Sequence, residues 1–188
     1  ISKLIVFRPL FGTVFLFLNK MEALDIPTMA VGVTRRVDLA LYYNPEFVES
    51  LTTDELKAVL IHEALHVLLH HITRATHFNY NMRNYNITAD MAINCNIVNL
   101  PEGAFYPSKF NLPDFESAEW YYESLKKEAD KNGQSMSEYS DGKGELVDDH
   151  SKWGECDEDV IKEKVRGIAN KAIKEQEKKG WGDIPGKV

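Results

Sequence analysis

Cysteine is scarce in this chain of 188 residues, which contains only Cys95 and Cys156. Two thiols far apart in the sequence cannot build the dense disulfide framework of a small secreted protein, and they do not form the paired-cysteine pattern of a structural zinc site. The scarcity of cysteine therefore favours a protein of the reducing cytoplasm.

Long hydrophobic runs and an excess of basic charge are also missing. The apolar run at residues 10–18 is too short to span a bilayer and is typical of a buried strand. The chain has 22 lysines and arginines against 29 aspartates and glutamates, and this net charge of −7 argues against a nucleic-acid surface. We expect neither a membrane nor a nucleic acid as partner, and a substrate that is not strongly acidic.

The composition fits one globular domain over residues 1–188. Hydrophobic residues make up 44% of the chain, and no low-complexity tract interrupts it. Asn-Gly and Asp-Gly pairs predict a mobile loop at about 131–149, before a last helix at about 157–179. The tail beyond that helix stops abruptly, so we expect the chain to be the N-terminal part of a longer protein.

A long helix is predicted from about residue 53 to about residue 73. Thr52 can cap its first turn, and Glu55 follows three residues later, which is the capping-box pattern. Ala58, Ile61, Leu65 and related positions form an apolar stripe along it. The helix should therefore pack against the core.

Residues 62–66 of this helix read His-Glu-x-x-His between apolar neighbours. His62 and His66 lie one turn apart on one face, so both imidazoles can reach one zinc ion, while Glu63 can deprotonate a zinc-bound water. The pattern indicates a metallopeptidase. The alternative is a pair of core histidines satisfied by hydrogen bonds, with Glu63 pointing to water.

A catalytic zinc usually has three protein ligands, so a third must come from elsewhere. A second helix is predicted at about 85–98, and its buried face carries Asp90 and, one turn later, Asn94. A buried carboxylate needs a cation, which favours Asp90 as the third ligand and Asn94 as the residue that orients a ligand histidine. Alternatively, Asp90 pairs with Arg74 or Arg83 in a structural salt bridge.

The remaining histidines differ in their prospects. His70 lies too far along the helix axis to share a zinc ion with His62, and His71 should point elsewhere. His150 follows two acids that could orient its ring, so it is a candidate donor to the oxyanion of a tetrahedral intermediate, or a replacement third ligand. An acidic, solvated loop is the alternative for that segment.

Three motifs carry a family resemblance: Leu-x-x-x-Leu-Ile-His-Glu-x-Leu-His, Ala-Asp-Met-Ala-Ile-Asn and Asp-Asp-His-Ser-x-Trp. Together they are similar to the Putative metallopeptidase domain family of bacteria and phages, which often precedes a von Willebrand A-like module. The resemblance covers most of the chain, at His62, Glu63, His66, Asp90, Asn94, His150 and Trp153. Gluzincins usually have Glu and then Asp at the positions that correspond to Asp90 and Asn94.

The resemblance implies an α+β, zincin-like fold, in which a small, twisted and mostly antiparallel sheet packs on the motif helix and the second ligand helix. Strands are expected near 28–33 and 37–43, and the latter is the candidate edge strand for pairing with an extended peptide. We therefore predict a metallopeptidase with one zinc ion. A non-catalytic zinc-binding interaction domain and a zinc hydrolase of a non-peptide substrate remain the alternatives.

Overall fold

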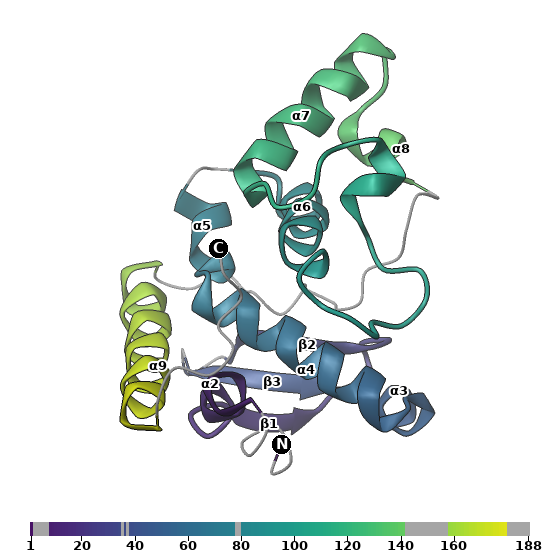
Figure 1. The fold of residues 1–188 in the computed structure, drawn as a ribbon. Helices are drawn as coiled ribbons and strands as arrows, with labels where there is room; N and C mark the ends of the chain where they lie inside the picture. Colours follow the sequence, from purple (N-terminus) through teal and green to yellow (C-terminus); the bar gives the residue numbers. More distant parts are fainter. Residues whose placement is uncertain (2–7, 35, 37, 78–79, 142–157, 180–188) are drawn as a thin grey trace.

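The computed structural model of the chain describes residues 1, 8–34, 36, 38–77, 80–141 and 158–179, and these form an α+β fold (Figure 1). The elements follow in the order α2 (Pro9–Val14), β1 (Asn19–Glu22), β2 (Met29–Val33), β3 (Leu39–Tyr43), α3 (Pro45–Ser50), α4 (Thr53–Leu68), α5 (His71–His77), α6 (Met82–Asn94), η1 (Pro107–Phe110), α7 (Ala118–Lys131), α8 (Met136–Ser140) and α9 (Glu158–Lys179).

The sheet is mixed, whereas a mostly antiparallel sheet was expected. Its order is β1-β3-β2, with β3 parallel to β1 and antiparallel to β2. The strand at 39–43 is therefore central, and the prediction that it offers a free edge to a peptide is wrong, because both of its edges are already paired. Of the two edge strands, β1 is exposed along its length and β2 is buried along its length.

The apolar segment at 10–18 is helical at its start, so the strand predicted there is wrong. Pro9 occupies the first turn of α2, where its missing N–H costs nothing and its fixed φ suits the helix. Phe11 and Val14 are buried, and α2 packs against α4 and α9. A short apolar run does not distinguish a buried helix from a buried strand, because an element buried on all sides has apolar residues at every position in either conformation.

Helix α4 begins where the capping box predicts. The Thr52 hydroxyl accepts a hydrogen bond from the Glu55 N–H, and a Glu55 carboxylate oxygen accepts one from the Thr52 N–H at 2.9 Å. The helix ends at Leu68, five residues before the predicted end at 73. His70 has a φ of 59°, in the left-handed region, so the helix cannot continue through it and α5 begins at His71.

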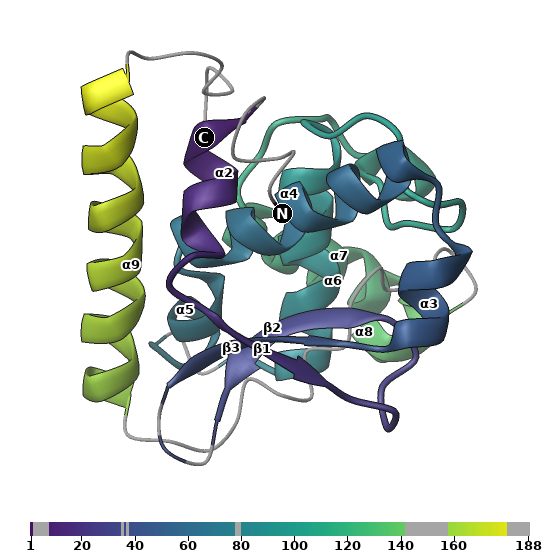
Figure 2. The same cartoon turned by 90° about the horizontal axis from the view of Figure 1, so that it is seen from below.

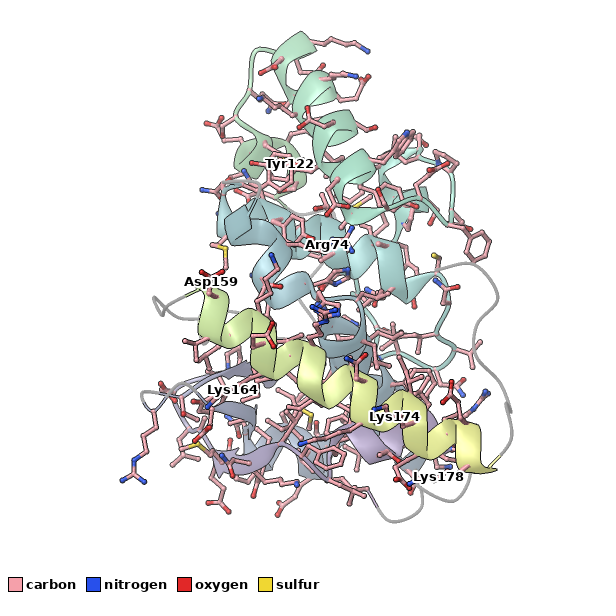
Figure 3. All side chains as sticks on the ribbon, turned by 90° about the vertical axis from the view of Figure 1, so that its left-hand side faces the viewer. Arg74, Tyr122, Asp159, Lys164, Lys174 and Lys178 are labelled. Atoms are coloured by element: carbon pink, nitrogen blue, oxygen red, sulfur yellow. The ribbon has the colours of Figure 1, made fainter. Side chains whose placement is uncertain are left out.

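Helix α4 lies between the sheet and the group of helices α6, α7 and α8 (Figure 1). Helix α9 runs beside α2 (Figure 2) and also contacts α4 and α5. Lys164, labelled on α9 in Figure 3, donates a hydrogen bond from its Nζ to Asp38 Oδ1, beside the sheet, at 2.5 Å. The predicted helices at 85–98 and 157–179 correspond to α6 and α9. The segment expected to be a loop from 131 contains α8, and residues 142–149 lie outside the described part of the chain.

In the described part of the chain, no helix is long and apolar enough to cross a membrane.

The main core joins α2, the sheet, α4, α6 and α7 through residues such as Val14, Val31, Ala64, Met91 and Leu125. Helix α4 therefore packs against the sheet on one side and against α6 on another. This packing fixes the position of the residues on its buried faces.

Thr52→Ala should lower the free energy of unfolding by about 1 kcal/mol, because the first turn of α4 loses the side-chain acceptor that satisfies the Glu55 N–H. Chemical denaturation measures the change. Thr52→Ser keeps the hydroxyl and should stay close to the parent. If both variants lose the same stability, the methyl group of Thr52 matters rather than the cap.

Candidate metal centre

Three side chains from α4 and α6 meet in the interior. The Nε2 atoms of His62 and His66 are 3.1 Å apart, and Asp90 Oδ1 lies 3.6 Å from the first and 3.4 Å from the second. All three side chains have 0% exposure. Among the described residues, His62, His66 and Asp90 form a group whose ligand atoms lie close enough together to hold one metal ion.

The His62 ring is held from its other nitrogen. His62 Nδ1 lies 2.8 Å from Asn94 Oδ1, and Asn94 Nδ2 donates to the carbonyl oxygen of Phe105 at 2.9 Å. The second bond fixes which end of the Asn94 amide faces His62, so His62 donates its Nδ1 proton to Asn94. The unprotonated Nε2 then faces His66 and Asp90. Asn94 thus makes the contact with a ligand histidine that the sequence predicted.

The His66 ring is held in a corresponding way by His71. The two Nδ1 atoms are 3.1 Å apart, and the ring planes are inclined at 72°. His71 is almost fully buried, with 1% exposure. The prediction that His71 points elsewhere is wrong, because it assumed one continuous helix through residue 73. The left-handed backbone of His70 turns His71 back towards α4. This change of direction shows in the φ angle of His70 and not in the pattern of apolar residues.

Glu63 is buried beside the group and contacts the sheet. Its Oε2 accepts a hydrogen bond of 2.6 Å from the Val31 N–H of β2. The Thr34 N–H donates to the Asp38 carbonyl oxygen, so the N–H of residue 34 points towards β3. In an antiparallel strand the backbone N–H groups of successive residues point to opposite sides. The Val31 N–H, three residues earlier, therefore points away from β3. Glu63 therefore does not point to water, and it occupies a backbone group that an added strand would need.

The structural salt bridge considered for Asp90 is absent among the described residues, because both candidate arginines pair elsewhere. Arg74 Nε donates to Glu119 at 2.8 Å, and Arg83 pairs with Asp141 at 2.9 Å. Figure 3 shows Arg74, which reaches from α5 towards α7. The two imidazoles of α4 lie 3.6 and 3.4 Å from Asp90 Oδ1.

Tyr85 packs edge-on against His71, with 6.1 Å between the ring centres, and its hydroxyl donates to Glu119 at 3.2 Å. Burial raises the pKa of the Tyr85 phenol well above its ordinary value, so it stays a neutral donor.

Burial and the nearby cations Arg74, Arg166 and Lys162 lower the pKa of His70. His70 is half-buried and does not belong to the metal group, as expected from its distance along the helix.

His150 and Trp153 lie outside the described residues, so the role of His150 stays a prediction. The structure brings together His62, His66 and Asp90 with Glu63 beside them. Asn94 and His71 contact the two histidines of this group, and helical periodicity predicted the contact of Asn94 but not that of His71.

The sequence matches one protein family, described as Putative metallopeptidase domain, over residues 1–186. The chain belongs to this family. No match was found among curated proteins or among solved structures. In this member of the Putative metallopeptidase domain family, His62, His66 and Asp90 thus form a group that could hold a metal ion.

The purified protein should contain one divalent metal ion per chain, and His66→Ala should lose it, because two remaining protein ligands hold such an ion poorly. Elemental analysis after dialysis measures this ratio. His70→Asn is the matched control: it removes a neighbouring histidine, and Asn tolerates a positive φ. A metal-free parent protein, or an unchanged metal content in His66→Ala, would contradict the site.

Proposed function

We propose that this domain is a zinc-dependent peptidase that uses His62, His66 and Asp90 as zinc ligands. Tetrahedral zinc with bonds of about 2.0–2.1 Å places its ligand atoms about 3.3–3.4 Å apart. The three separations of 3.1, 3.4 and 3.6 Å lie around this value. The spacing of the donor atoms, all with the hard or borderline character that zinc accepts, supports zinc as the ion.

The donor set favours a catalytic site over a structural one. Structural zinc sites usually close with four cysteines or histidines, whereas two histidines and one carboxylate leave a position for water or substrate. When bound, zinc polarises a carbonyl group and lowers the pKa of a water ligand. Asp90 contributes one negative charge to this centre, while Asn94 and His71 hold the imidazoles without adding charge.

Glu63 is the proposed general base, and its position carries the proposal. It follows His62 directly on α4, and its carboxylate is buried and anchored through Oε2 by the Val31 N–H. A structural metal site does not require a buried carboxylate at this position, and its burial costs free energy. In the proposed reaction Glu63 takes a proton from the attacking water and later delivers it to the leaving amine.

The peptide substrate follows from the family's description, since metal, base and water alone do not define the scissile bond. His150 is the proposed donor to the developing oxyanion. A cytoplasmic location and a C-terminal von Willebrand A-like module are further parts of the proposal, from the scarcity of cysteine and from the family resemblance. Hydrolysis of unfolded casein or of a peptide library by the zinc-loaded protein tests the activity.

Glu63→Gln should keep zinc and the fold but lower the hydrolysis rate by about 10²–10⁴-fold, because an amide cannot take a proton from water. The glutamine oxygen can still accept the Val31 N–H, so the variant separates the base from the anchor. Rates are measured on zinc-loaded protein at matched metal content.

Equal rates for Glu63→Gln and the parent protein would refute the general-base role. A parent that binds zinc and turns over no peptide would favour the interaction domain. Turnover of esters without turnover of peptides would favour a hydrolase of another substrate. Zinc content alone does not separate these outcomes, so the casein and ester assays together decide between them.

His150→Ala should lower kcat by about 10²–10³-fold with zinc content preserved, which is the effect of removing one oxyanion donor. Steady-state kinetics and elemental analysis are run on the same preparation. Loss of zinc would instead make His150 a ligand and demote Asp90. Unchanged kcat and unchanged zinc would remove His150 from the site.

A further inference from the structure

We infer that His71 is a positioning residue of the metal centre, which accepts the Nδ1 proton of His66 and so holds the Nε2 atom of His66 towards the metal. The inference deepens the proposed function, because it rests on the metal group of His62, His66 and Asp90. It assigns a role to a buried histidine that is not itself one of the three ligands.

The contact is direct and shielded from water. The Nδ1 atoms of His66 and His71 lie 3.1 Å apart, within hydrogen-bond range, and the two side chains have 0% and 1% exposure. The ring centres are 5.0 Å apart. The ring of Tyr85 makes a T-shaped contact with the ring of His71, with 6.1 Å between the ring centres. Burial of this kind makes each nitrogen depend on its protein neighbour, because water cannot replace it.

The positions of the protons follow from what a metal requires. His66 binds through Nε2 only if that nitrogen carries no proton, so its single proton must sit on Nδ1. That proton faces His71 Nδ1, which must then be the acceptor, and His71 carries its own proton on Nε2. In the opposite arrangement His71 donates, His66 is protonated on Nε2, and the metal cannot bind there.

His71 thus does for His66 what Asn94 does for His62. Both partners accept the Nδ1 proton of a ligand ring at 2.8–3.1 Å, and both are neutral. The helix break makes this possible. In a continuous helix, five residues at about 100° each would turn residue 71 about 140° away from His66. The left-handed residue His70 interrupts α4 and returns His71 to the same side.

Two substitutions separate the acceptor from the shape. Asn and Leu have the same branched skeleton, and the δ oxygen of Asn can take the place of the histidine Nδ1 as acceptor. His71→Leu removes the acceptor, whereas His71→Asn retains one. Zinc affinity is measured by competition with a chelator, and the visible spectrum of the cobalt-substituted protein reports the geometry of the centre.

His71→Leu should bind zinc about 10–100-fold more weakly than the parent, the range found when such partners are removed. His71→Asn should restore most of this loss and the parent cobalt spectrum. Circular dichroism of the metal-free variants checks that both fold. Equal losses in the two variants, or parent-like affinity in His71→Leu, would overturn the inference.

A second measurement needs no variant. In nitrogen-15-labelled, zinc-loaded parent protein, NMR correlations between ring nitrogens and ring protons identify the protonated nitrogen of each histidine. We expect His66 protonated on Nδ1 and His71 on Nε2. A proton on Nδ1 of His71 with Nδ1 of His66 bare would reverse the bond and overturn the inference.

The outcomes for the two proposals are distinguishable. A parent protein that binds zinc and hydrolyses no peptide refutes the peptidase, while the affinities of the Leu and Asn variants still decide the role of His71. A parent protein that binds no zinc refutes the metal centre and overturns the inference with it.

Discussion

The burial of one carboxylate, that of Asp90, is the constraint around which the rest of the site is arranged. Removing an ionised carboxylate from water costs several kcal/mol unless a cation and hydrogen bonds compensate for it. Arg74 and Arg83, the two arginines considered as its partners, pair with Glu119 and Asp141. Two neutral imidazoles compensate poorly. A divalent ion between these donors would remove the penalty, so metal binding and the packing of α6 on α4 would support each other.

The partners of the two ligand histidines show how the chain limits the charge at this centre. A carboxylate behind each ring would have placed more buried negative charge near Asp90 and Glu63. Asn94 and His71 accept the same protons without charge. Among the described residues, Asp90 and Glu63 together would then offset the two positive charges of a bound divalent ion. Further carboxylates behind the rings would make the centre net negative, which would weaken its ability to polarise a carbonyl group.

Much of the site could be predicted because it depends on regular helices. The spacing of His62 and His66 fixes their common face, and an acid within an apolar stripe identified Asp90. The fold was harder to predict where the signals were short. The apolar run at 10–18 suits a strand or a buried helix equally. Strand order depends on pairings between distant residues, so nothing local in the sequence placed β3 at the centre of the sheet.

The case of His71 shows why the missing part could not be predicted from periodicity. A periodic analysis assumes that each residue adds the same rotation, and one residue with φ near 59° invalidates every assignment after it. A histidine in that conformation is uncommon, and its backbone costs about 1–2 kcal/mol relative to a helical residue. The surrounding packing of α5 against α6 must supply this free energy. The return is a buried partner for His66, which a straight helix could not have provided from the same segment.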